Sequence, residues 1–479
     1  MTIDVHVASG VVRGHVDGDV TVFRGIPYAN LDERFGAPSP VHSWDGVREA
    51  VTFGPSPPQS GSFGMDSLRR QGDDWLTVNV WSPDLAGGLP VMVWIQGGAY
   101  AFGRSSLPEY DGSNLARGGV VVVTFNYRVG LEGFGYVAGT LANRGLLDQV
   151  AALEWVRENI GAFGGDRDRV TVFGQSAGAG SVAALMVMPR AAGLFRRAIA
   201  QSMPGTYFTP ALAADITRAC AEQLGIEPTE LPATDPWRLP AAGDAVLATM
   251  DRFAARWGLA AHAKVLFSPV VDGDVLPCTP WRGLAGQVDL MVGHTRHEQR
   301  LLSLVSGLLG KVTEVDATEA ATLFAPDPER YREIFPDPED RYEAVRSDWL
   351  FRMPSVHLAE AQRTAGGRAH LYELTWPAPG LEGALGACHG LDVPLVFGNL
   401  AVGQPAVLIG DPTPAAVEVS EQMQHAWRAF ATNGDPGWPA HDNGLTRLFD
   451  IEPRVTAYPE HLSRQIWSDP PDALDLIGE

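Results

Sequence analysis

A serine between two glycines, at a predicted strand-to-helix junction, constrains the fold of this chain more than any other feature. The segment Val170-Thr-Val-Phe-Gly174-Gln-Ser176-Ala-Gly178 fits the pattern G-x-S-x-G. Arg169–Phe173 predicts a short strand, and Ala177–Met188 predicts a helix that Pro189 ends. The glycines permit a tight turn that projects Ser176 outward, near helix amides that favour developing negative charge. The motif in this context predicts Ser176 as a nucleophile.

Apolar runs and helical stretches alternate along much of the chain. Leu89–Ile95 and Val120–Phe125 are near-continuously apolar, as expected of parallel strands that are covered on both faces. The stretch from Leu146 to Ile160 has its apolar residues on one helical face, and strand-like sequence returns at Leu290–Gly293 and His370–Leu374. Strands and helices in this order predict an α/β fold with a mostly parallel sheet and right-handed crossovers.

The 479 residues contain no internal repeat and no low-complexity linker. Two stretches, about 205–262 and 300–363, are helical and irregular, and strand-like sequence follows each of them. We therefore expect residues 1–479 to form a single domain in which these two stretches are helical insertions. The insertions are expected to form the walls of a substrate pocket.

Charge and composition exclude several classes of function. The chain has 36 Lys plus Arg against 57 Asp plus Glu, a formal net charge of −21, which disfavours binding to nucleic acid and to anionic membranes. No apolar run is long enough to predict a transmembrane helix, and no signal peptide is visible at the N-terminus. Cys220, Cys278 and Cys388 are too few and too scattered for a disulfide framework or a zinc site. These features predict a soluble cytoplasmic protein; they say nothing of its oligomeric state.

An activated serine needs donors for the oxyanion that forms when it attacks a carbonyl. The segment Trp94-Ile-Gln96-Gly97-Gly98-Ala99-Tyr100 follows a predicted buried strand, and glycine allows bare backbone to approach a substrate. Taken alone, two glycines after a strand more often form a simple turn. Beside the serine turn, they predict an oxyanion hole made of the amides of Gly97, Gly98 and Ala177.

With these residues identified, the chain resembles the type-B carboxylesterase/lipase family, the cholinesterase-like α/β-hydrolases, and among them bacterial members of the p-nitrobenzyl esterase type. The resemblance covers most of the chain and implies the α/β-hydrolase fold, with a central sheet flanked by helices. It rests on several long motifs besides the two above: Phe23-Arg-Gly-Ile-Pro-Tyr-Ala29, Asp73-Asp-Trp-Leu-Thr-Val-Asn-Val-Trp81, Asn143-Arg-Gly-Leu-Leu-Asp-Gln149, Phe163-Gly-Gly-Asp166 and Phe430-Ala-Thr-Asn-Gly-Asp-Pro436.

The family's Ser–Glu–His triad can be carried over residue by residue. The family's acid lies just after a strand in a T-x-x-E-like turn, which Glu298 matches in Val292-Gly-His-Thr-Arg-His-Glu298. The family's histidine matches His389 in Cys388-His389-Gly-Leu-Asp-Val-Pro. Ser202 matches a family serine that supports the triad acid. The resemblance, and not the sequence pattern, selects His389 from the twelve histidines.

The resemblance implies a serine carboxylesterase that works through an acyl-enzyme and needs no metal or organic cofactor. His297-Glu298 begins like the zinc motif H-E-x-x-H, but residue 301 is Leu. The same machinery on a carbamate, an amide or a lactone stays open, because one triad serves all of these bonds. Family members that lost catalysis and became binding proteins form another class, but they lack a triad residue.

The chain departs from the family pattern at three places. Gln96 stands where a histidine often precedes the oxyanion glycines, and Asn30-Leu-Asp-Glu-Arg34 shortens the N-terminal signature. Pro57 and Trp75 stand where many secreted relatives have two cysteines that close a loop. The joint absence of these cysteines agrees with a reducing compartment.

Overall fold

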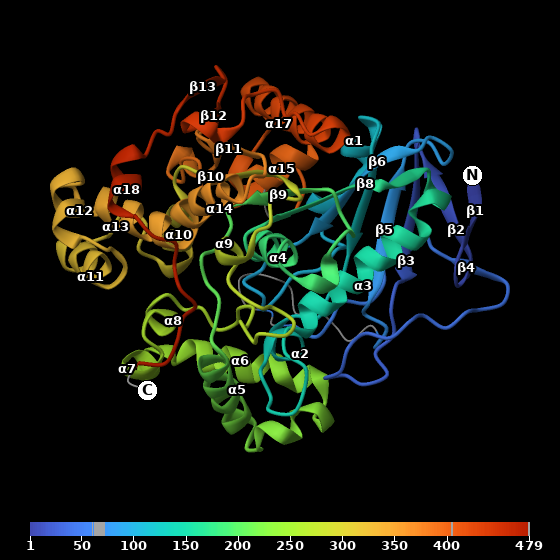
Figure 1. The fold of residues 1–479 in the computed structure, drawn as a ribbon, viewed down its shortest axis with the longest axis horizontal. Coiled ribbons are helices and arrows are strands. Elements are labelled where there is room, and N and C mark those ends of the chain that lie inside the picture. Colours follow the sequence, from blue (N-terminus) through green and yellow to red (C-terminus); the bar gives the residue numbers. More distant parts are fainter. Residues whose placement is uncertain (60, 62–71, 404–405, 478–479) are drawn as a thin grey trace.

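The computed structural model describes residues 1–59, 61, 72–403 and 406–477. A thirteen-stranded twisted sheet runs through these described residues, with helices on both faces (Figure 1). Its strands are β1 (Thr2–Val7), β2 (Gly10–Asp17), β3 (Val20–Pro27), β4 (Val47–Glu49), β5 (Thr77–Ser82), β6 (Leu89–Ile95), β7 (Val121–Phe125), β8 (Gly165–Gln175), β9 (Arg197–Gln201), β10 (Asp289–Thr295), β11 (Ala369–Leu374), β12 (Leu445–Phe449) and β13 (Arg454–Ala457).

The middle of the sheet is parallel and its two ends are antiparallel. Its strand order is β1-β2-β3-β5-β7-β6-β8-β9-β10-β11-β12-β13, with β4 paired to β2. Within this order, the run β7-β6-β8-β9-β10-β11-β12 consists of parallel pairs. The antiparallel pairs lie among β1, β2, β3, β5 and β7 and between β12 and β13. The predicted α/β class and mostly parallel sheet are therefore confirmed, whereas the N-terminal antiparallel strands carried no comparable signal.

Alternate residues of the central strands face two different cores. In β6, Val91, Val93 and Ile95 pack on one side, and Met92 and Trp94 pack on the other. The first core includes α3 (Arg144–Asn159), α4 (Ala177–Leu185) and α14 (Met353–Thr364); the second includes α1 (Ser113–Arg117), α15 (Asp392–Phe397) and α17 (Pro414–Asn433). Because both faces of these strands are buried, their sequences are continuous apolar runs.

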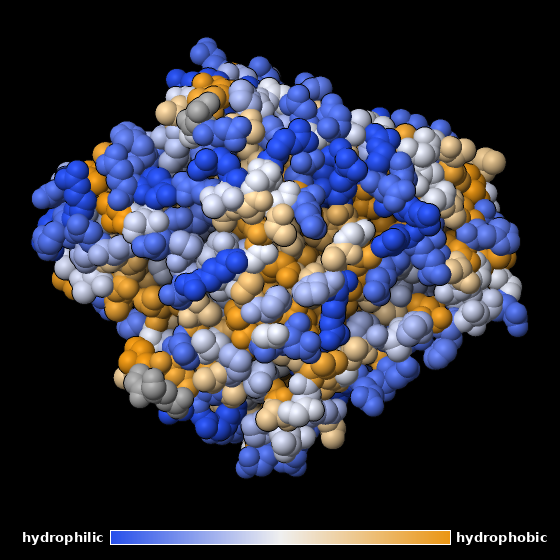
Figure 2. Space-filling view, in the orientation of Figure 1, coloured by the Kyte–Doolittle hydropathy of each residue, from blue (hydrophilic) through white to orange (hydrophobic). Residues whose placement is uncertain are grey.

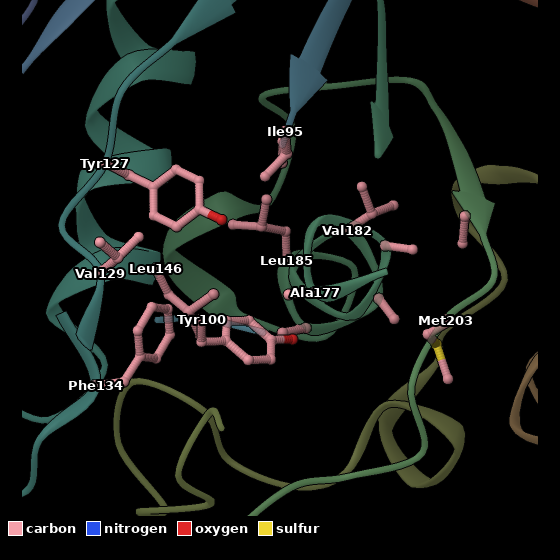
Figure 3. Close-up of a cluster of buried hydrophobic side chains, with 14 of the residues drawn as sticks. Ile95, Tyr100, Tyr127, Val129, Phe134, Leu146, Ala177, Val182, Leu185 and Met203 are labelled. Carbon is pink, nitrogen blue, oxygen red and sulfur yellow. The ribbon is translucent and has the colours of Figure 1, made fainter. Parts of the chain in front are cut away.

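Helix α4 lies at the centre of the first core and carries the serine turn at its start. Figure 3 shows α4 nearly end-on, with Ala177, Val182 and Leu185 directed into a cluster of apolar side chains. Tyr100 and Phe134 lie side by side in this cluster, with ring centroids 4.7 Å apart. The predicted helix over Ala177–Met188 ends three residues earlier, because Met186–Met188 form turns before Pro189.

The two predicted insertions are helical and lie beside the sheet (Figure 1). The first contains α5 (Pro210–Leu224), α6 (Leu239–Ala248), α7 (Ala254–Trp257) and α8 (Leu259–His262). The second contains α10 (Glu298–Ser306), α11 (Glu314–Phe324), α12 (Pro328–Ile334) and α13 (Pro338–Ser347), a π-helical turn at Asp348–Arg352, and α14. The remaining helices are α2 (Gly130–Phe134), α9 (Pro280–Gly283), α16 (Ala406–Ile409) and α18 (His461–Ile466).

The C-terminal segment connects the two insertions. After α18, the Trp467 indole donates to the Tyr331 hydroxyl on α12 at 2.6 Å. The chain then continues to the first insertion, where the Leu474 amide donates to the Tyr207 carbonyl and the Ile477 amide to the Arg256 carbonyl. Figure 1 shows this red segment running from α18 to α7.

The face of the molecule in Figure 2 is mostly hydrophilic at its rim, with apolar residues toward the middle. Among the helices of the described residues, none combines the length and the apolar character needed to cross a membrane.

Candidate active site

The predicted site residues follow the carboxyl ends of neighbouring parallel strands. The glycines Gly97 and Gly98 follow β6, Ser176 follows β8, Ser202 follows β9, and Glu298 lies three residues beyond β10. Strands β6, β8, β9 and β10 are adjacent and parallel. Their carboxyl ends share one edge of the sheet, which is where α/β folds bind ligands.

Ser176 adopts a backbone conformation that is rare for a side-chain-bearing residue, with φ 56° and ψ −127°. Its amide donates to the Gln201 carbonyl at 2.9 Å, and its carbonyl accepts from the Gly180 amide at 3.0 Å. A Cβ at Gly178 would lie 2.0 Å from the Ile95 carbonyl oxygen, so only glycine allows α4 to approach β6 this closely. A backbone conformation like that of Ser176 costs about 1–3 kcal/mol and persists only where the surrounding structure enforces it.

Glu298 and His389 form a buried, charge-assisted pair. Glu298 Oε2 lies 2.5 Å from His389 Nδ1, and the side chain of Glu298 is fully buried while His389 is 8% exposed. Burial alone would raise the pKa of Glu298, but His389, the Ser202 hydroxyl and the Thr295 amide together lower it below the ordinary value. Glu298 is therefore an ionised carboxylate that accepts a hydrogen bond from the protonated Nδ1 of His389.

Two loops distant in sequence hold this pair in place. The His297 amide donates to the Ala387 carbonyl at 2.8 Å, and the Ala387 amide donates to His297 Nδ1 at 3.2 Å. His297 and Cys388 form an isolated parallel bridge. Burial and nearby arginines lower the pKa of His297 to about 3, so this ring is neutral and can accept the bond. The loop after β10 and the loop before α15 are thus joined at His297 and Cys388, the residues that directly precede Glu298 and His389.

The other imidazole nitrogen contacts the residue before Ser176. His389 Nε2 lies 3.1 Å from Gln175 Nε2. Because Nδ1 donates to Glu298, Nε2 carries the lone pair and the Gln175 amide is the donor. In this conformation the nitrogen that would take the Ser176 proton is hydrogen-bonded to Gln175. A hydrogen bond between a catalytic base and its nucleophile often forms or tightens only when substrate binds.

An aromatic ring packs flat on His389. Phe351 stacks on the imidazole with ring centroids 4.3 Å apart and an angle of 28° between the planes. Phe351 lies in the π-helical turn of the second insertion, and such turns occur often at functional sites. Neither Phe351 nor Gln175 had been selected from the sequence, because neither residue type is diagnostic there.

Ser202 lies next to the Glu298–His389 pair, and the glycine loop lies next to Ser176. Ser202 is buried with φ 52°, and its hydroxyl is one of the groups that lower the pKa of Glu298. A Cβ at Gly97 would lie 3.1 Å from Ser176 Cβ, so this loop passes directly beside Ser176. Gly98 has φ 120° and Ala99 has φ 51°, while Ala177 is the first residue of α4. The first amides of a helix have no intrahelical acceptor, and positive φ turns the loop amides in unusual directions.

Gln96 lies behind this loop and is fully buried. Its carbonyl accepts from the Tyr127 hydroxyl at 2.7 Å. Neither polar atom of its side-chain amide has a hydrogen-bond partner among the described residues. This departure from the family pattern therefore lies behind the loop that contacts Ser176, and not in the surface that a substrate would reach.

Comparison with known proteins identifies the family. A model described as the carboxylesterase family matches residues 2–460. The chain belongs to the carboxylesterase family. This carboxylesterase is 37% identical over 480 residues to the para-nitrobenzyl esterase of Bacillus subtilis (strain 168), covering 95% of the chain and 96% of the relative. The resemblance to that esterase type is thus confirmed.

Two further relatives extend the comparison. The carboxylesterase is 34% identical to the phenmedipham hydrolase of Pseudarthrobacter oxydans, covering 96% of the chain and 98% of the relative. It superposes on the crystal structure of a carboxylesterase of Geobacillus stearothermophilus with a TM-score of 0.85 and 34% identity, covering 97% of this chain and all of the other. The α/β-hydrolase fold and the assignment as a carboxylic ester hydrolase follow.

A second buried carboxyl group lies near the pair in this carboxylesterase. Asp392 accepts from the Gln201 amide at 2.7 Å, and the Gln201 side-chain oxygen accepts from the Trp427 indole at 2.9 Å. Burial raises the pKa of Asp392 to about 6. The pKa values of the two buried acids near His389 are therefore shifted in opposite directions. Glu298, which contacts the ring directly, is the one that stays ionised.

Proposed function

We propose that this carboxylesterase hydrolyses small to medium apolar carboxylic esters with Ser176 as nucleophile, His389 as general base and Glu298 as the residue that orients His389. The observation that carries the proposal is the 2.5 Å hydrogen bond between Glu298 and His389, next to the strained turn that bears Ser176. This geometry favours the Nδ1-protonated tautomer of the imidazole, in which the lone pair of Nε2 can act as a base.

The first half-reaction makes the acyl-enzyme. As Ser176 Oγ attacks the ester carbonyl carbon, its proton passes to His389 Nε2, which exchanges its bond to Gln175 for one to the serine. Glu298 stabilises the imidazolium without taking the proton. When the tetrahedral intermediate collapses, the carbon–oxygen bond to the alcohol breaks and His389 returns the proton to the leaving alcohol.

The second half-reaction releases the acid. Water loses a proton to His389 Nε2 as it attacks the acyl-enzyme, and His389 then protonates Ser176 Oγ as the acid leaves. In both halves the amides of Gly97, Gly98 and Ala177 are the proposed donors to the oxyanion. Support for these donors comes from the approach of Gly97 to Ser176 and from the place of Ala177 at the start of α4. Each such donor is worth roughly 10²–10³ in kcat.

A p-nitrophenyl ester series from acetate to octanoate tests this proposal, with Ser176→Ala as the control. Wild type should hydrolyse part of the series, and the variant should lose about 10⁶-fold in kcat while its melting temperature stays close to wild type. A fluorophosphonate should label wild type and not Ser176→Ala. Turnover and labelling that persist in Ser176→Ala would overturn the assignment of the nucleophile.

A second candidate function uses the same residues on a carbamate, amide or lactone. The observation that favours it is a relative named for another compound, the phenmedipham hydrolase. Labelling of Ser176 without turnover of any p-nitrophenyl ester would select this candidate.

We further propose that the protein acts in the cytoplasm on a small molecule and not on nucleic acid. Its net charge of −21 supports the second part. The first part is supported by its cysteines: Cys220, Cys278 and Cys388 are all free thiols in the structure.

A further inference from the structure

The residue after Glu298 is held by a carboxyl group that the mechanism above does not use. The Gln299 amide donates to Glu343 Oε1 at 3.1 Å and to Ser347 Oγ at 3.0 Å. The Ser347 hydroxyl in turn donates to Glu343 Oε1 at 2.6 Å. All three residues are buried, with at most 8% of each exposed. They form a closed triangle of hydrogen bonds one residue away from the acid of the Glu298–His389 pair.

Helix α10 depends on this external partner, because its own start supplies none. Glu298 is the first residue of α10, and His297 before it makes no capping hydrogen bond with its side chain. The His297 ring instead accepts from the Ala387 amide. The first amides of a helix have no acceptor within the helix, and leaving such an amide buried and unpaired is costly. The carboxyl group of Glu343, on α13, therefore takes the place of a cap on α10.

Helix α13 is connected to both members of the pair. It packs against α10 (Figure 1), and through Glu343 it holds the residue that follows Glu298. Its last residue, Ser347, leads directly into the π-helical turn from which Phe351 stacks on His389. One continuous stretch of chain therefore supports both Glu298 and His389.

The surroundings of Glu343 make the place of its oxygen more important than its charge. Burial raises the pKa of Glu343 to about 7, although the Ser347 hydroxyl, Arg352 and the Gln299 amide lower it. Near neutral pH a large part of Glu343 is therefore the neutral acid. Glutamine has nearly the same shape as that neutral acid and keeps an oxygen that can accept from the Gln299 amide.

We propose that Glu343 is a positioning residue for the reaction: by accepting from the Gln299 amide it fixes the first turn of α10, and with it the direction in which Glu298 presents its carboxylate to His389. The inference rests on the proposed function and adds to it a residue of the second insertion. Because Glu298 acts on His389 and not on the substrate, loss of this support should lower kcat and leave KM nearly unchanged.

Glu339 on the same helix offers a matched control. Like Glu343, it is a carboxyl group of α13 that accepts from backbone amides, those of Gly310 at 2.9 Å and Val312 at 3.3 Å. Both amides belong to the loop after α10. Removing Glu339 therefore removes a similar interaction from the same helix and leaves the first turn of α10 as it is.

The experiment compares kcat and KM of wild type, Glu343→Ala, Glu343→Gln and Glu339→Ala at pH 7 on p-nitrophenyl acetate and octanoate. Glu343→Ala should lose about tenfold or more in kcat on both esters, with KM within about threefold of wild type. Glu343→Gln should keep kcat within about threefold, because the Gln299 amide keeps its acceptor. Glu339→Ala should lower the melting temperature and keep kcat within about twofold.

A kcat of Glu343→Ala close to wild type would overturn the inference. An equal loss of kcat in Glu339→Ala, or in Glu343→Gln, would also overturn it. Glu343→Asp covers the case in which the alanine variant does not fold, since it keeps the carboxyl group and shortens the side chain by one methylene. It should lose about tenfold in kcat on both esters, and a kcat equal to wild type would reject the positioning role.

Proton NMR separates this inference from the proposed function, because it needs no turnover. The Nδ1 proton of His389, in its hydrogen bond to Glu298, should give a low-field resonance that Glu298→Gln identifies by its loss. A resonance that shifts in Glu343→Ala and stays in place in Glu339→Ala supports the positioning role even if no ester is hydrolysed. An unchanged resonance in Glu343→Ala, together with normal ester hydrolysis by wild type, would reject the role and leave the function standing.

Discussion

The turns at the carboxyl edge of the sheet and the helical insertions beside it contribute to the site in different ways. In the turns, Ser176, Gly178 and Glu298 are held by close backbone approaches and hydrogen bonds of 2.5–3.0 Å. In the first insertion, α6 presents apolar side chains to a pocket, and an added Cβ at Gly243 meets only ordinary contacts.

The catalytic geometry and the substrate preference can therefore change separately in this fold. A turn that must place a proton or an oxyanion tolerates little displacement, because 1 Å of misplacement can cost 10²-fold in rate. A pocket wall made of helical side chains can change its shape without moving the reacting atoms. We therefore expect turn substitutions to slow every ester and substitutions in the first insertion to alter preference.

Among the substitutions that test this expectation, the largest effect should come from Glu298→Gln. Glutamine cannot stabilise the imidazolium of His389 and can favour its wrong tautomer, so kcat should fall about 10⁴-fold on every ester. The measurement is kcat across the p-nitrophenyl series at pH 7.5, with the melting temperature as a control for folding. A fall of less than tenfold would show that Glu298 does not orient His389.

Gly178→Ala should come next. The new Cβ would lie 2.0 Å from the Ile95 carbonyl oxygen, which forces the start of α4 away from β6 and moves Ser176. We expect a loss of stability of about 1–3 kcal/mol and of activity by about 10²-fold.

Gly161→Ala is the matched control for Gly178→Ala, because a Cβ there has nothing within 4 Å. Urea unfolding and kcat of the two variants compare a crowded glycine with an open one. Similar behaviour of both would refute the close approach of α4 to β6.

Asp392→Asn tests the second buried acid beneath the turns. Its folded pKa is raised from 3.8 to about 6, so the stability that its protonated form contributes is fully present below pH 3.8 and is lost as pH rises through 6. Asparagine keeps an acceptor for the Gln201 amide without the charge, so above pH 6 it should stabilise the fold by up to about 3 kcal/mol.

Thermal unfolding from pH 4.5 to pH 7.5 measures this difference, which should grow with pH. The exposed Asp411, substituted to Asn, serves as the control and should show no such growth. If Asp392→Asn stabilised the fold most at low pH, this would contradict the upward direction of the pKa shift.

The smallest effect is expected from Phe351→Leu, which tests whether an insertion residue can act on the reacting atoms. Phe351 belongs to an insertion but stacks on His389, so it should behave like a turn residue. Aromatic pairs contribute about 0.5–1.5 kcal/mol beyond burial, which corresponds to a loss of about three- to tenfold in kcat. The loss should be equal from acetate to octanoate, and a dependence on chain length would make Phe351 a pocket residue instead.

The parallel centre of the fold could be predicted because its signals are local. β6 matches the predicted strand residue for residue, and α3 differs from the prediction by two residues at its start and one at its end. The antiparallel β1 to β3 escaped prediction because partly buried or exposed residues interrupt their buried ones, so they lack a continuous apolar run. The single-domain organisation stays a prediction.

Ser176 was predicted from the residues alone, because a glycine-flanked serine at a strand-to-helix turn is a local pattern. Glu298 and His389 came from family resemblance, since 91 residues separate them and nothing local connects them. Gln175 and Phe351 gave no signal, because glutamine and phenylalanine acquire a role only by what they touch.

The parallel centre of the sheet, the serine turn and the family can be recognised in the amino-acid sequence, since they depend on periodicity and on residues within a few positions of each other. Three further properties follow from the folded structure alone: Gln175 and Phe351 contact His389, Glu298 is ionised while Asp392 resists ionisation, and α6 faces the glycine loop across a pocket. The physical reason is that these properties depend on burial and on distances between residues far apart in the chain, and both exist only once the chain has packed.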